Sequence, residues 1–131
     1  MTLIKAQLKH LHISPRKVRL VADAIRRKNA DTASRILDFM PKRSALPLKK
    51  LLNSACANAR NNFNLSDSNL YVKEIRVDKG AVLKRYMPQA RGSAHIIRRR
   101  ASHIFMVLEE KKKFMSHSVH PYSFRLGIIR E

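Results

Sequence analysis

Several features are scarce or missing in this chain of 131 residues, and each absence excludes a class of structure. Cys56 is the only cysteine, which rules out an internal disulfide and a zinc site built from several cysteines. There are only three glycines, and none lies in a phosphate-binding loop. No run of ~18 or more apolar residues occurs, so no transmembrane helix is expected. The first ten residues lack the apolar core of a signal peptide, so we expect a protein of the cell interior or of an organelle.

Acidic residues are scarce as well. The chain has 28 Lys and Arg residues against 9 Asp and Glu, a formal net charge of +19 at pH 7. Residues 79–108 contain no acid, and they include the segment KRYMPQARGSAHIIRRR, residues 84–100. Such a segment is either a solvated, disordered charge run or it lies against a large polyanion. Because 44% of the residues are hydrophobic, we expect a folded single domain over residues 1–110 and a polyanionic partner.

The first half of the chain shows one strand pattern and three helix patterns. Alternation predicts a strand over residues 3–11. Ser14 and Pro15 are typical of a helix start, and Asp31 is a suitable N-cap for a second helix that ends at Phe39. A third helix runs from about Ser44 to about residue 62. The first helix carries one apolar stripe, which we expect to be buried: Val18, Val21, Ala22 and Ile25.

Two details of the third helix bear on function. Cys56 lies among alanines, so we expect a small buried residue rather than a reactive thiol. The segment NARNNFNLSDSN is expected to leave the helix and turn, and its asparagines could also donate hydrogen bonds to RNA.

Period-two patterns return at residues 70–80 and 102–110 and predict two strands. In the first we expect Tyr71, Ile75 and Val77 on the face opposite Glu74 and Arg76. Together the elements predict an α+β fold, with three helices packed on a small antiparallel sheet that carries a long extended β-hairpin.

The two strands, paired as a hairpin, place the turn near residues 90–92. Residues from about 79 to 102 then form an arm that projects roughly 40 Å, at ~3.3 Å per residue. Isolated two-stranded ribbons are marginal in water, so we expect this arm to be mobile until a partner holds it. Tyr86 and Met87 would pack on each other or stack on bases.

Three function classes fit a basic folded domain: a structural rRNA binder, a sequence-specific DNA-binding protein and a nucleic-acid-modifying enzyme. The nine acidic residues are scattered and form no pair beside a histidine, which argues against catalysis. The basic residues are spread over helix, loop and hairpin rather than gathered on one recognition helix. Arg16, Lys17 and Arg19 lie off the apolar stripe; they form either a solvated basic face or a phosphate site, and the net charge favours the phosphate site.

Four segments carry a resemblance to a known family: SPRKVRLVAD, SACANARNNFNL, LYVKEIRVDKG and LKRYMPQARGSAHIIRRRASHI. In order and spacing they resemble bacterial-type large-subunit ribosomal protein twenty-two, over roughly residues 9–109. The resemblance implies a structural constituent of the large ribosomal subunit and not an enzyme. In that family the domain sits on large-subunit rRNA near the peptide exit, and the hairpin lines the nascent-peptide tunnel.

The resemblance also implies the surroundings of the protein. The expected partners are large-subunit rRNA, neighbouring large-subunit ribosomal proteins and the nascent peptide at the hairpin tip. A membrane, a second copy of the chain, a metal and a cofactor are not expected. The expected location is the ribosome, in the bacterial cytoplasm or in the matrix or stroma of an organelle.

The family motifs and the basic surface together give two sets of candidate residues. Contacts to rRNA are expected from Lys9, Ser14, Arg16, Lys17, Arg19, Arg26, Lys49, Arg60, Lys79, Lys84, Arg85, Arg91, Arg98, Arg99, Arg100, Ser102 and His103. The tunnel-lining tip is expected to comprise Met87, Pro88, Gln89, Ala90, Arg91, Gly92, Ser93 and Ala94. Gln89 and Ser93 stand where the family commonly has a basic residue.

The tail, residues 111–131, lies outside this family pattern. From Met115 onward it resembles instead the start of small-subunit ribosomal protein three. His117 and His120 have the spacing of metal ligands, but no other ligand type lies close to them in the sequence, so we expect no metal there.

Overall fold

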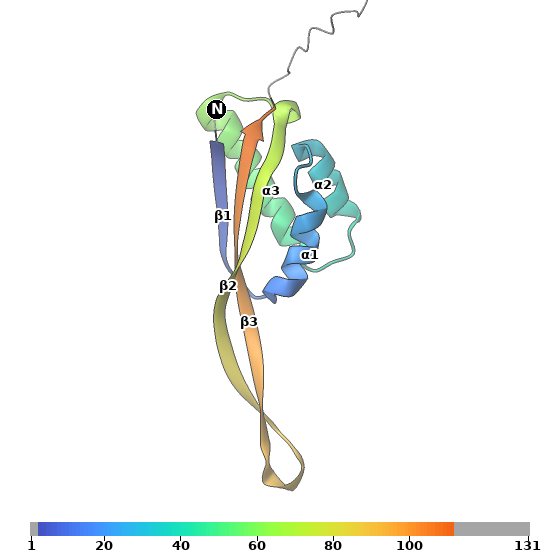
Figure 1. Cartoon of the computed structure of the whole chain (residues 1–131), viewed down its shortest axis with the longest axis vertical. Helices are drawn as coiled ribbons and strands as arrows, with labels where there is room; N and C mark the ends of the chain where they lie inside the picture. Colours follow the sequence, from blue (N-terminus) through green and yellow to red (C-terminus); the bar gives the residue numbers. More distant parts are fainter. Residues whose placement is uncertain (1–2, 112–131) are drawn as a thin grey trace, which may run out of the picture.

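A single long antiparallel hairpin dominates the structure, and the other elements pack against one half of it (Figure 1). The computed structural model describes residues 3–111. Its elements are β1 (Leu3–Leu11), α1 (Pro15–Ile25), α2 (Ala30–Phe39), α3 (Ala45–Phe63), β2 (Leu70–Pro88) and β3 (Ala94–Glu110), with short 3-10 turns at Asp67–Asn69 and Ala90–Gly92. The predicted α+β fold is confirmed, and so is the hairpin turn near residues 90–92.

The helix α1 begins as the sequence predicts. Pro15 occupies its first turn, and the backbone carbonyl of Ser14 accepts hydrogen bonds from the amides of Lys17 (3.0 Å) and Val18 (3.2 Å). The Ser14 side chain makes no capping hydrogen bond. The predicted apolar stripe is buried along its whole length, and Arg16 and Lys17 lie exposed outside it.

The other two helices differ from the prediction at their ends. Asn29, not Asp31, occupies the N-cap of α2, and Asp31 lies within the first turn. At the far end of α3 the helix continues to Phe63, and Asn64 closes it in the left-handed conformation (φ 51°). Asparagine tolerates this conformation better than most residues, which explains why the helix ends at this position of the Asn-rich segment.

The sheet has the strand order β1-β3-β2, with β3 in the centre and antiparallel to both neighbours. The register of β2 shifts between Val72 and Glu74, which marks a β-bulge. Because of this bulge, Tyr71 lies on the same face as Glu74, opposite Ile75 and Val77. The predicted placement of Tyr71 beside Ile75 and Val77 is therefore wrong.

The three helices cover one face of this sheet (Figure 1). The core lies between the two layers, and its largest fully buried side chains include Ile4, Ile25, Leu52, Ile104 and Leu108. Cys56 packs against this core but is only half-buried, less than the buried residue that the sequence predicted.

The outer edge of β2 is also occupied. The amide of Arg27 donates to the Val72 carbonyl (3.0 Å), and the amide of Val72 donates to the Lys28 carbonyl (2.9 Å). The segment between α1 and α2 thus takes the hydrogen bonds that an unprotected edge strand would offer to another chain.

A second bulge marks the point where the hairpin leaves the sheet. The register of β2 shifts between Lys79 and Val82, so two residues of β2 stand opposite Ala101. Gly80 is one of them: a Cβ atom at this position would lie 3.0 Å from the Ala101 carbonyl carbon and 3.2 Å from its Cβ. Only glycine fits this close approach of the two backbones without a shift.

Candidate nucleic-acid interface

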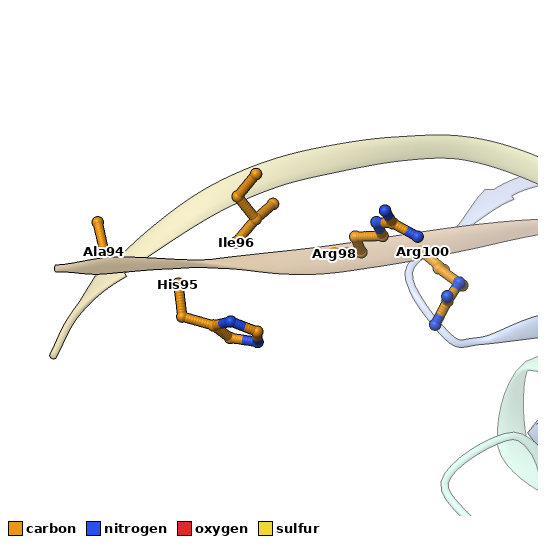
Figure 2. Close-up of a pocket in the computed structure, with 5 residues that line it drawn as sticks. All are labelled: Ala94, His95, Ile96, Arg98 and Arg100. Atoms are coloured by element: carbon orange, nitrogen blue, oxygen red, sulfur yellow. The ribbon is translucent and has the colours of Figure 1, made fainter.

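Beyond the second bulge the hairpin continues as a two-stranded ribbon, residues 82–88 paired with residues 94–100, which we call the distal hairpin. Every residue of the ribbon is exposed except Ile97, which is partly buried. Side chains alternate between the two faces of such a ribbon. Figure 2 shows this alternation near the tip, with Ala94 and Ile96 on one side and His95 on the other.

The tip is held by its own polar groups. The amide of Gln89 donates to the Ser93 carbonyl (2.8 Å), and the Ser93 hydroxyl donates to the Ala90 carbonyl (2.9 Å). Arg91 and Gly92 adopt left-handed backbone conformations, with φ values of 59° and 72°. The Ser93 side chain therefore helps to close the turn, whereas Gln89 contributes its backbone amide.

The distal hairpin and its turn concentrate positive charge. Six basic side chains lie there with no acid among them: Lys84, Arg85, Arg91, Arg98, Arg99 and Arg100. All six are exposed, and in the part of the chain that the structure describes none makes a side-chain hydrogen bond or a salt bridge. A shallow hollow of about 570 Å³ runs along the ribbon and is lined by Ala94, His95, Ile96, Arg98 and Arg100 (Figure 2).

The apolar residues of the distal hairpin are also exposed. Tyr86 pairs across the ribbon with Ile96, and Tyr86 is 71% exposed. Met87 follows Tyr86 in the same strand, so the two side chains point to opposite faces and do not pack on each other. Of the two roles considered for Tyr86, the ring stays available for stacking on a base.

Acidic residues are instead found in the globular part, where they neutralise basic neighbours. Five salt bridges occur within residues 3–111: Asp23 with Arg26, Asp38 with Lys49, Asp67 with Arg60, Glu109 with Lys73 and Asp78 with Arg76. Glu109 is buried, and hydrogen bonds from Tyr71 and then Lys73 lower the pKa of its carboxyl group. Three residues expected at the rRNA surface, Arg26, Lys49 and Arg60, are thus already paired within the protein.

The basic residues of α1 and its C-cap residue Arg26 divide into two kinds. Arg16 and Lys17 are exposed and point away from the core. Arg19 donates from Nε (3.2 Å) and Nη2 (2.9 Å) to the carbonyl of Val77, and Arg26 donates from Nη2 to the carbonyl of Ile75 (3.2 Å). Both arginines therefore bind the outer edge of β2, close to the point where the hairpin leaves the sheet.

Residues at the root of the hairpin complete the set. Lys9 and Lys79 are exposed, and Ser14 is partly buried. The amide of His10 donates to Nδ1 of His103 (3.1 Å), which leaves Nε2 as the other polar atom of that ring. Ser102 is fully buried, with 0% exposure, and its hydroxyl makes no hydrogen bond within the described residues, so its contact with RNA stays a prediction that the free chain does not favour.

The structure also shows a basic surface that the sequence reasoning missed. Phe39, at the end of α2, is 87% exposed, and Lys42 and Arg43 follow it as exposed residues. The sequence could have indicated this surface, because Phe39 falls outside the apolar stripe of its helix.

Other kinds of site are not found within residues 3–111. That part of the chain holds no group of three or more His, Cys, Asp or Glu side chains placed to bind a metal. None of its helices is long and apolar enough to span a membrane. The residues considered for a metal in the tail, His117 and His120, lie outside the described range, as does the resemblance that starts at Met115.

Comparison with known proteins agrees with this basic hairpin domain. The family model described as ribosomal protein L22p/L17e matches residues 6–109. The protein named large ribosomal subunit protein uL22 from Desulfitobacterium hafniense is 51% identical over 109 residues, which cover 83% of this chain and 96% of that protein. The protein of the same name from Thermus thermophilus is 50% identical over 107 residues, covering 82% of this chain and 95% of the relative.

A third relative gives the same picture: the large ribosomal subunit protein uL22 of Deinococcus radiodurans is 49% identical over 106 residues, covering 81% of this chain and 79% of that protein. The match takes in both the helical layer and the whole hairpin. The chain therefore belongs to the ribosomal protein L22p/L17e family and is a structural component of the ribosome, not an enzyme.

Proposed function

We propose that this chain takes the place in the large ribosomal subunit that the names of its relatives describe, and that it binds large-subunit rRNA there. The observation that carries the proposal is the distal hairpin, with six exposed basic side chains and no acid among them. Phosphate groups are the ligands that such a surface fits, because they neutralise charge on both strands of the ribbon at once.

The fold supports RNA rather than a free solvated ribbon. A two-stranded ribbon buries little apolar surface and is marginal in water. Here Val82, Leu83, Tyr86, Met87 and Ile96 are each at least 43% exposed, so the ribbon has no core of its own. An RNA fold around the ribbon would supply both the counter-charge and the missing cover.

Neutralising two facing cations by substitution tests this proposal. Lys84 and Arg98 are partners across the ribbon, and changing both to Gln removes two phosphate contacts. The slope of log affinity for purified large-subunit rRNA against log salt should then fall by about 1.4 to 1.8. The matched control changes Lys5 and Lys28, two exposed cations outside the proposed surface, to Gln. Equal slopes for both variants would overturn the assignment.

We further propose that the hairpin tip borders the nascent-peptide tunnel, as the family resemblance implies. The tip contains several short side chains, Ala90, Gly92, Ser93 and Ala94, which leave room for a passing chain, while Arg91 projects from it as the one long basic residue. Deleting residues 83–85 should shift the tip and change how nascent chains or tunnel-binding drugs behave in ribosomes that carry the variant. The helical layer should melt as in the parent chain. Unchanged drug binding in such ribosomes argues against a tunnel position.

We also propose that residues 1–110 form the complete rRNA-binding domain. A chain that ends at Lys113 should fold and bind large-subunit rRNA with the affinity of the full chain, because the buried core and the distal hairpin both lie before that point. Loss of folding or of affinity on truncation would place the domain boundary further along the chain.

A further inference from the structure

The connection between α2 and α3 carries an exposed aromatic ring in a setting of positive charge. Phe39 ends α2 and is 87% exposed, the highest exposure among the large hydrophobic residues of the described chain. Burial of a phenylalanine side chain is normally favourable, and within residues 3–111 the fold does not bury this one. Figure 1 shows this connection at the outer edge of the helical layer, on the side away from β1.

Basic residues flank this ring in the sequence, and all of them are exposed. Arg35 lies one helical turn before Phe39 on the same face of α2. Lys42 and Arg43 follow within four residues, and the connection is kept compact by hydrogen bonds from the Lys42 amide to the Met40 carbonyl (2.8 Å) and from the Ala45 amide to the Lys42 carbonyl (2.9 Å). The Cα atom of Lys42 is therefore at most ~11 Å from that of Phe39.

The acid beside the ring in the sequence does not oppose an anion at this place. Asp38 is the acid next to Phe39 in the sequence, and its carboxylate is neutralised by Lys49. The first turn of α3, which follows directly, has no acidic residue. All three cations, Arg35, Lys42 and Arg43, are exposed and make no salt bridge within residues 3–111.

We propose that Phe39, Arg35, Lys42 and Arg43 bind one unpaired nucleotide of RNA, with the base stacked on the Phe39 ring and the adjoining phosphates on the three cations. This inference rests on the proposed rRNA-binding function. An aromatic ring between basic side chains is the usual arrangement for holding an unstacked base, because every base has a flat face and phosphates on both sides.

The connection between α2 and α3 fits a protein partner less well than it fits RNA. The exposed apolar side chains here are Phe39 and Leu46, which is 64% exposed. Two such side chains supply much less than the ~800 Å² per partner of a stable protein interface. Three unpaired cations would also have to be desolvated or matched by acids, whereas RNA phosphates match them directly.

Two substitutions distinguish stacking on the aromatic ring from a simple apolar contact. In the full chain, Phe39→Leu keeps an apolar side chain and removes the ring, while Phe39→Tyr keeps the ring. Affinity for purified large-subunit rRNA should fall about fivefold to a hundredfold for Phe39→Leu, the range expected for one base stack, and change less than about twofold for Phe39→Tyr. Affinity for a fully paired RNA duplex should be the same for both variants, because no base is accessible there. The melting temperatures should match the parent, since the side chain is exposed.

The outcomes are distinct. Equal rRNA affinity for Phe39→Leu and the parent overturns the inference, and so does an equal loss for Phe39→Tyr. If Phe39→Leu binds purified rRNA normally but sediments less with intact large subunits, the connection between α2 and α3 faces a protein and the inference is overturned. Failure of the parent chain itself to bind rRNA would instead refute the proposed function. Changing Lys42 and Arg43 to Gln should lower the salt slope by about 1.4 to 1.8, and an unchanged slope contradicts the phosphate contacts.

Discussion

The two halves of the β2–β3 hairpin share one hydrogen-bond ladder but have opposite environments. In the half near the helices, β3 lies between β1 and β2, and residues such as Ile75, Ile104 and Met106 are almost completely buried. Among the residues that the structure describes, 3–111, no third strand pairs with the distal half, no helix covers either of its faces, and no acid balances its cations. Within the described residues the distal half lacks the cover that the first half has, and the proposed RNA contacts would supply it.

The bulge at Gly80 divides the two halves. On the domain side, Arg19 and Arg26 bind carbonyls of β2, so cations stabilise the protein itself. On the distal side, the cations are free of such contacts in the structure described. The same residue types thus have a structural role on one side of the bulge and an RNA-binding role, as proposed, on the other.

Removing the distal hairpin should have the largest effect on rRNA binding. Replacing residues 82–100 by a two-residue Asn-Gly turn removes six basic side chains but none of the buried core. The salt slope for rRNA binding should fall by about 4 to 5, and the melting temperature should change by only a few degrees, because the lost segment buries little surface. A slope within one unit of the parent chain would show that the globular part dominates binding.

Hydrogen exchange should show the same division within one molecule. In the isolated protein, amides of residues 82–100 should exchange rapidly, whereas amides of residues 70–78 and 102–109 should be protected up to the stability of the whole domain. In the assembled large subunit both groups should be protected. Equal protection of residues 84–100 in the isolated and the assembled protein would refute ordering by RNA.

Single substitutions should distinguish the structural role of Arg19 from the proposed RNA-binding role of Lys17, both on α1. Arg19→Gln should lower the free energy of unfolding by about 1–2 kcal/mol, because the partly buried Val77 carbonyl loses its donors. Lys17→Gln should leave stability unchanged and lower the salt slope by about 0.7 to 0.9. Thermal melting and rRNA titration on the same two variants measure both effects. A stability loss for Lys17→Gln equal to that of Arg19→Gln would remove the distinction.

Much of this division could be predicted from the sequence because it depends on periodicity and composition. The stripe of α1, the turn at residues 90–92 and the acid-free arm are each visible in the order of residue types. The bulge at Lys73 was not, because one extra residue in a strand leaves no compositional mark, and it moved Tyr71 to the other face. The roles of Arg19 and Arg26 were also missed, since only the packing of α1 on β2 shows which arginines reach a carbonyl.

The reactivity of the Cys56 thiol gives a final and smaller test. Cys56 lies in α3, so its rate of labelling depends on the packing of the helices, which cover only the half of the hairpin near the domain. Burial, and then the nearby carboxylates of Asp67 and Asp31, raise its pKa from 9.0 to about 11, with Arg60 acting in the opposite direction. At pH 8 the thiolate fraction is then about a hundredfold lower than in the unfolded chain, and the greater nucleophilicity of a high-pKa thiolate offsets about tenfold of this. Labelling by iodoacetamide should therefore be about tenfold slower than in urea and should accelerate as the pH rises toward 11.

The sign of the pH effect on stability follows from the same shift. Between pH 9 and 11 the native state keeps a proton that the unfolded state has lost, so the contribution to stability is complete below pH 9 and disappears as the pH rises through 11. The rate of labelling at pH 8 should be unchanged in the chain that lacks residues 82–100, because the helices pack on the other half of the hairpin (Figure 1). Faster labelling in that variant would mean that the distal hairpin stabilises the helical cover, and the two halves would then be one cooperative unit rather than two.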